Sequence, residues 1–162
     1  MESEPLVAND IEQLYRERAG HYVGLAEWLV GSRAHAEEIV QDVFTQLVAR
    51  PPQLSNADAA EAYVRRAVVN RSNSRIRRFV LERRHGETMV DDGYEDARPD
   101  HEIRSAVSSL PVRQRQCVVL RFYEDLTVEQ IATQLGMRPG TVKSHLHRAI
   151  TSLGSSLKGV HS

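Results

Sequence analysis

Residues 126–153, LTVEQIATQLGMRPGTVKSHLHRAITSL, constrain the fold of this chain most, because they hold the signals for two helices and the turn between them. Thr127 and Gln130 have the spacing of a capping box at the start of the first helix. Gly136 is the residue type that ends a helix in the left-handed conformation, and Pro139 is tolerated in the first turn of the next helix. This order of signals predicts a helix-turn-helix.

The second helix of this motif is predicted to have one apolar and one polar face. Its apolar positions at helical spacing are Val142, Leu146, Ala149 and Leu153. Its outer positions are Thr141, Lys143, Ser144, His147 and Arg148. An ordinary helical hairpin with a solvated outer face would give a similar pattern. The combination of the capping box with Ala132, Gly136 and Val142 favours DNA binding, with the outer face in a major groove.

Composition predicts an all-α protein of one medium domain or two small ones. Aromatic residues are scarce, at 6% of 162 residues, and no β-branched alternation is evident. The single cysteine, Cys117, lies in the apolar run CVVL, which favours a buried structural thiol over a nucleophile and excludes an internal disulfide. No run is long enough to span a membrane and no signal peptide is recognisable, so we expect a cytoplasmic protein without membrane insertion.

Charge alternates in blocks along the chain, although the formal net charge is only −1. Residues 1–64 hold eleven acids and four Arg, and residues 65–85 hold eight Arg and one Glu. Residues 86–102 hold seven acids and one Arg, and residues 103–162 hold eight Lys or Arg and three acids. The two basic blocks predict two contacts with nucleic acid.

The first 84 residues predict three helices. The first spans residues 10–30, Gly31 ends it, and Ser32 caps the second, whose apolar stripe runs from Ala36 to Val48. The opposite face of the second helix is acidic and amide-rich, and no basic residues at i+4 pair with all three of Glu38, Gln41 and Asp42. The third helix, residues 59–84, carries many arginines without compensating acids, which favours an anionic partner over a solvated surface.

The chain divides into two predicted helical domains. Residues 1–85 form the first and residues 101–162 the second. Residues 86–100, GETMVDDGYEDARPD, are acidic, lack an apolar period and are expected to form a flexible linker.

Three segments, in this order and spacing, resemble extracytoplasmic-function (ECF) sigma factors, the minimal group of the sigma-70 family. HAEEIVQDVFTQLVAR resembles the polymerase-binding region, and AYVRRAVVNRSNSRIRRF resembles the segment that melts and reads the −10 element. LPVRQRQCVVLRFYEDLTVEQIATQLGMRPGTVKSHLHRAITSL resembles the domain that reads the −35 element. The resemblance implies a sigma-2-like and a sigma-4-like domain, with core RNA polymerase (its clamp and flap regions) and promoter DNA as partners. Members of the family are commonly held by anti-sigma proteins, and nothing in this sequence encodes such a partner.

The resemblance also implies a role for particular residues. The residues expected to bind the polymerase clamp are Glu38, Gln41, Asp42, Thr45 and Gln46. Those expected at the −10 element are Leu54, Ser55 and Asn56, around a flipped base, together with Asn70, Arg71, Asn73 and Arg77 on the opened strand. Those expected at the −35 element are Arg138, Thr141, Lys143, Ser144, His147 and Arg148.

Two other interpretations compete with this one. The run TVKSHL is similar to LuxR-type regulators, which bind DNA without being polymerase subunits, but such proteins carry a ligand or receiver domain upstream, usually with β-strands. A metalloenzyme is disfavoured because His145 and His147, two apart on a helix, point to different faces. No Cys pair, HExxH motif or phosphate-binding glycine loop is present, so we expect no catalytic residues, no metal and no cofactor.

Overall fold

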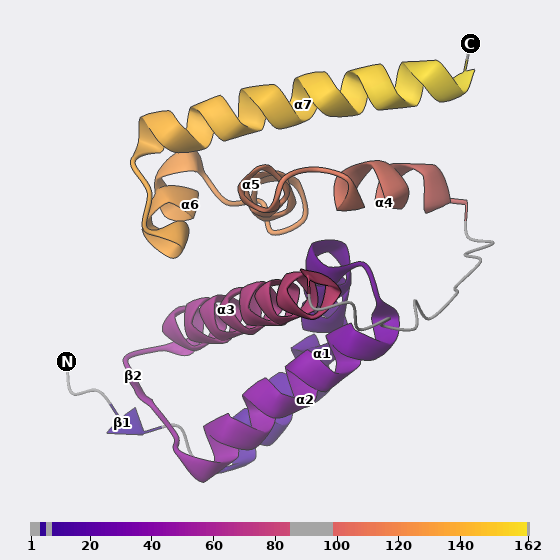
Figure 1. Cartoon of the computed structure of the whole chain (residues 1–162). Coiled ribbons are helices and arrows are strands. Elements are labelled where there is room, and N and C mark those ends of the chain that lie inside the picture. Colours follow the sequence, from indigo (N-terminus) through magenta and orange to yellow (C-terminus); the bar gives the residue numbers. More distant parts are fainter. Residues whose placement is uncertain (1–3, 6–7, 85–98, 162) are drawn as a thin grey trace. The chain divides into compact units, whose positions relative to one another are not determined.

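The computed structural model describes residues 4–5, 8–84 and 99–161. The chain divides into two compact units, Met1–Glu87 and Thr88–Ser162, and each is described by itself. Both units are built from helices, so the predicted all-α class is confirmed (Figure 1). The predicted linker falls almost entirely on residues 85–98, which lie outside the described residues.

Unit 1 is a three-helix assembly of α1 (Ala8–Val30), α2 (Arg33–Ala49) and α3 (Ala57–Arg84) (Figure 1). Its core is mainly apolar, with Leu25, Val40 and Val64 less than 2% exposed. Two short strands, β1 (Glu4–Pro5) and β2 (Gln53–Leu54), pair antiparallel beside the entry to α3. All three helices therefore contribute to one core, which fixes the outer faces of α2 and α3.

Local capping explains where the helices of unit 1 begin and end. Gly31 adopts φ +80° after α1, a conformation that costs a side chain with Cβ about 1–2 kcal/mol. Ser32 then caps α2, because its hydroxyl accepts a hydrogen bond from the His35 amide at 3.3 Å. Asn56 caps α3, because its side-chain oxygen accepts a hydrogen bond from the Ala59 amide at 2.8 Å.

Unit 2 contains α4 (His101–Ser108), α5 (Val112–Phe122), α6 (Val128–Leu135) and α7 (Pro139–His161) (Figure 1). Its core gathers Leu120 from α5, Ile131 from α6 and Val142 from α7, all fully buried. Arg115 closes the α4–α5 turn by donating to the carbonyl oxygens of Ser108 and Leu110, at 2.8 and 3.1 Å. Burial lowers the pKa of that guanidinium from its ordinary value.

Cys117 is confirmed as a buried structural thiol of α5. Its side chain is inaccessible to solvent. Burial raises the pKa of the Cys117 thiol to about 11, against a smaller opposing effect of the Arg113 charge. The reactive thiolate is therefore scarce at neutral pH.

One residue of the predicted apolar stripe on α2 was assigned wrongly. Val48 is 59% exposed, although the stripe from Ala36 to Leu47 is buried as expected. The reason is its position in the last turn of α2, where the helical periodicity places it outside the core, on the side of α1.

No helix in the described part of the chain is long and apolar enough to cross a membrane.

Candidate nucleic-acid and partner interfaces

The turn between α6 and α7 is built as its sequence predicts. Gln130 Oε1 accepts from the Thr127 amide at 2.9 Å, and Thr127 Oγ1 accepts from the Gln130 amide at 3.1 Å, which completes the capping box. Gly136 adopts φ +65°, and the Met137 amide bonds to the Ala132 carbonyl at 3.0 Å. The turn thus fixes the direction in which α7 leaves α6.

All six residues predicted at the −35 element lie exposed at the start of α7 or just before it. They are Arg138, Thr141, Lys143, Ser144, His147 and Arg148. Val142 and Ala149 are fully buried on the opposite side, so at about 100° per residue Ser144 lies at the centre of the exposed face. His147 and Arg148 flank Ser144, while Lys143 and Thr141 lie at the two edges. The cations of this face make no ion pair within the described part of the chain.

The five residues predicted to bind polymerase are all exposed on α2: Glu38, Gln41, Asp42, Thr45 and Gln46. Four of them divide between two edges of the helix, and the fifth, Gln46, is exposed. Gln41 and Thr45, one turn apart, face α1. Glu38 and Asp42, also one turn apart, face α3.

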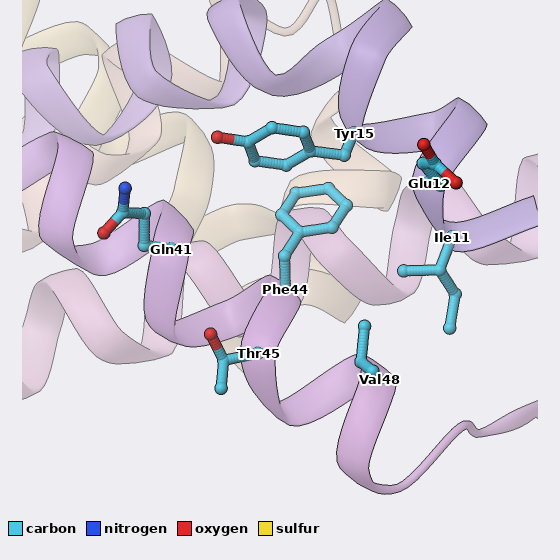
Figure 2. Close-up of a pocket in the computed structure, with 7 residues that line it drawn as sticks. All are labelled: Ile11, Glu12, Tyr15, Gln41, Phe44, Thr45 and Val48. Carbon is cyan, nitrogen blue, oxygen red and sulfur yellow. The ribbon is translucent and has the colours of Figure 1, made fainter. Parts of the chain in front are cut away.

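The α1-facing edge lines an open groove of about 470 Å³. Figure 2 shows Ile11 and Tyr15 from α1 opposite Phe44 and Val48 from α2. The rings of Tyr15 and Phe44 meet edge to face, with centroids 5.1 Å apart. Tyr15 remains 41% exposed, so this apolar surface stays open to a partner.

This groove, which we call the α1–α2 groove, was not predicted from the sequence. Gln41 and Thr45 were identified from α2 alone, but the apolar lining comes from both helices. The available signal was the apolar periodicity of α1, which includes Tyr15. Periodicity indicates which residues share an apolar helix face, but it does not show that the Tyr15 ring remains partly exposed to solvent.

The α3-facing edge of α2 forms ion pairs with α3. Asp42 Oδ2 lies 3.7 Å from Arg71 Nη1, and Glu38 is hydrogen-bonded to Arg75. We call these four residues the α2–α3 seam. The expectation that the arginines of the third helix lack compensating acids is therefore wrong for Arg71 and Arg75, because their acids come from α2.

The other residues predicted at the −10 element lie on α3 and the loop before it. Asn70, Asn73 and Arg77 share one face of α3, at i, i+3 and i+7, separate from the seam. Leu54 is half-buried in β2, whereas Ser55 and Asn56 are exposed. The Asn56 side-chain oxygen caps α3, and this hydrogen bond fixes the loop to the first turn of that helix.

Comparisons with known proteins decide between the competing interpretations. Residues 14–79 match Sigma-70 region 2, and residues 100–153 match Sigma-70, region 4. An RNA polymerase sigma-E factor from Streptomyces antibioticus is 31% identical over 153 residues, covering 92% of this chain and 85% of that protein. The chain belongs to the sigma-70 family of RNA polymerase sigma factors. The ECF sigma factor SigL from Mycobacterium tuberculosis is also similar to it, with 30% identity over 90% of this chain and 87% of that protein.

A solved structure shares the fold of this sigma factor. The sigma factor RpoE from Bartonella quintana, in complex with the anti-sigma factor NepR, gives a TM-score of 0.74. It covers 93% of this chain and 98% of that chain at 21% identity. The LuxR-type alternative finds no support, because the upstream unit is helical and matches region 2 of sigma factors. Within the described residues, His, Cys, Asp and Glu form no group suited to a metal ion.

Proposed function

We propose that this chain binds core RNA polymerase and directs transcription from promoters with particular −10 and −35 elements. One observation carries the proposal: the chain joins a region 2 match and a region 4 match, with the predicted polymerase and −35 residues exposed and none of the predicted −10 residues fully buried. A LuxR-type regulator would carry a ligand or receiver domain in place of the region 2 match. As an initiation factor the chain carries no catalytic residue of its own and acts in the bacterial cytoplasm, where the polymerase is.

The polymerase clamp docks on α2. Its partner surface is basic opposite Glu38 and Asp42, and supplies an apolar side chain to the α1–α2 groove beside Gln41 and Thr45. Gln46 lies at the margin of this contact. The exposed area of Tyr15 and Val48 supports the proposal, because burial of apolar surface at the centre of an interface supplies much of its affinity.

Unit 1 also holds the opened −10 element. Leu54, Ser55 and Asn56 surround the flipped base. The separated strand is contacted by Asn70, Arg71, Asn73 and Arg77. Flipping a base costs a few kcal/mol, so the polymerase must contribute to strand opening.

Unit 2 reads the −35 element with α7 and contacts the polymerase flap. Ser144, at the centre of the exposed face, and the uncharged His147 beside it contact base edges. The cations Arg148, Lys143 and Arg138 contact phosphates, together with Thr141 at the edge of the face. We also propose an anti-sigma protein, a partner common in the family, as a binding partner of this chain.

The test uses the purified full chain and bacterial core polymerase. The two should co-elute in gel filtration, and the complex should initiate at discrete positions in a library of promoter fragments. The transcribed fragments should share a −35 and a −10 sequence. Failure to co-elute would overturn the proposal, and tight sequence-specific binding to duplex DNA without polymerase would favour the regulator instead.

A further inference from the structure

The α2–α3 seam joins the proposed polymerase face to the proposed DNA face. Glu38 and Asp42 are 60% and 64% exposed, and their partners Arg75 and Arg71 are 27% and 33% exposed. The acids are thus open to a docking partner, whereas the arginines lie beneath them along α3. Glu38 lies on the same edge of α2 as Asp42, one turn away.

The seam is not needed to hold α2 against α3. The two helices already share a core in which Val40, Val64 and Val68 are buried to about 1% exposure or less. Ion pairs with such exposed acids contribute little to stability because water competes for both partners. Weak pairs of this kind exchange partners readily when a stronger counter-charge arrives.

We propose that Arg75 is a further DNA-contacting residue beside Arg71, and that Glu38 and Asp42 restrain both arginines in the free chain. The inference rests on the proposed function of α3 as the strand-holding helix. Arg71 and Arg75 lie one turn apart, so together they present two cations toward neighbouring phosphates of one strand. While Arg71 and Arg75 are paired with the two acids, the charges of the four groups sum to zero, so the arginines attract phosphate only weakly.

The same acids are proposed to meet basic groups of the polymerase. A basic surface docked on Glu38 and Asp42 would compete with Arg71 and Arg75 for the carboxylates. Linkage then requires that docking raise the affinity of the arginines for DNA, and that DNA raise the affinity of docking by the same factor. The seam thereby couples the two faces through four side chains.

A rival account gives the acids the opposite role. Carboxylates that orient an arginine can improve its contact with phosphate, and neutralising them would then weaken DNA binding. The two accounts predict opposite signs for one measurement.

The experiment measures the free full chain with a fluorescent 12-nucleotide single-stranded DNA, by anisotropy over a series of KCl concentrations. The variant Glu38→Gln with Asp42→Asn removes two negative charges and keeps the side-chain shapes. The matched control, Glu17→Gln with Glu37→Gln, makes the same change in net charge. Glu17 bonds to Gln13 and Glu37 pairs with Arg33, so neither restrains an α3 arginine.

The seam variant should bind the oligonucleotide about threefold to tenfold more tightly than the control, with a salt slope steeper by about 1.4 for two released cations. Adding Arg71→Gln and Arg75→Gln to the seam variant should return affinity and slope to the wild-type values or below. Each single acid variant should give part of the gain, which keeps the test valid if the double variant unfolds in a circular dichroism melt.

Equal binding by the seam and control variants, or weaker binding by the seam variant, would overturn the inference. The assay contains no polymerase, so its outcome is separate from that of the proposed function. If the chain directs transcription but the seam variant gains nothing, only the seam proposal fails. If the chain does not co-elute with core polymerase, the proposed function fails whatever the seam does.

Discussion

The two basic helices of this molecule, α3 and α7, differ in whether their cations form ion pairs with other helices. On α3, Arg71 and Arg75 lie against Asp42 and Glu38 of the neighbouring helix. On α7, Arg148 and its neighbouring cations make no ion pair in the described part of the chain. The difference teaches that a basic run in a sequence is only a candidate for nucleic-acid binding, because a neighbouring helix can balance it.

The largest expected effect concerns Ser144, at the centre of the open face of α7, and the adjacent His147. Changing Ser144 and His147 together to Ala should relax base preference in the −35 element, since each good base contact contributes about 1–3 kcal/mol of discrimination. A promoter library transcribed by the variant with core polymerase measures this preference. An unchanged −35 preference would contradict the assignment of these two residues as base contacts.

The turn between α6 and α7 should show the next largest effect, on protein stability. Gly136→Ala should destabilise the protein by about 1–2 kcal/mol, because φ +65° is strained for a residue with Cβ. Gly140→Ala is the control: it lies in the first turn of α7, where an added Cβ would meet nothing within 4 Å beyond its chain neighbours and the backbone of its own helix, and should stabilise by about 0.4–1 kcal/mol. Thermal and urea melts measure both, and equal effects would mean that the turn conformation is not what requires glycine.

Arg148, the cation that flanks Ser144, should behave differently from Ser144 and His147. Arg148→Gln should weaken binding to all promoters alike and lower the salt slope by about 1, as expected for one lost phosphate contact. Binding of polymerase holoenzyme to several promoters across a salt series measures both quantities. A loss confined to promoters with one particular −35 base would instead make Arg148 a base contact.

The seam should have the smallest effect on stability. Asp42→Asn should change the free energy of unfolding by no more than about 1 kcal/mol, because Asp42 is 64% exposed and its pair with Arg71 is solvated. A urea melt measures this directly, with Glu37→Gln as control for another exposed ion pair. A loss above about 2 kcal/mol would show that the seam holds α2 to α3, and would weaken its proposed role in restraint.

Features specified by neighbouring residues were predictable from the sequence. The capping box of Thr127 and Gln130, the left-handed Gly136 and the Ser32 cap each depend on residues within four positions. Local signals were therefore enough to place the −35 candidates on an exposed helical face. Their contacts with DNA stay predictions.

Features that join distant parts of the chain were not predictable in the same way. Glu38 and Arg75 are 37 positions apart, and no periodicity within α2 or α3 indicates that they meet. The α1–α2 groove likewise needs the packing angle of two helices to leave Tyr15 and Val48 open. The assignment of Glu38 and Asp42 to a face without structural partners failed for this reason.

Transcription with a charged residue placed in the α1–α2 groove tests the central claim most directly. Gln41→Arg puts a cation at the proposed polymerase face, and the control Gln13→Arg puts the same side chain on an exposed position of α1 outside the groove. The proposed partner is apolar beside Gln41 and basic opposite Glu38 and Asp42, so a cation at position 41 would be buried without a partner and repelled by its neighbours. Gln41→Arg should therefore reduce promoter-specific transcription by core polymerase about tenfold or more. Both variants should melt like the wild type, and Gln13→Arg should transcribe like it. Full transcription by Gln41→Arg would contradict the claim that this face of α2 docks on polymerase.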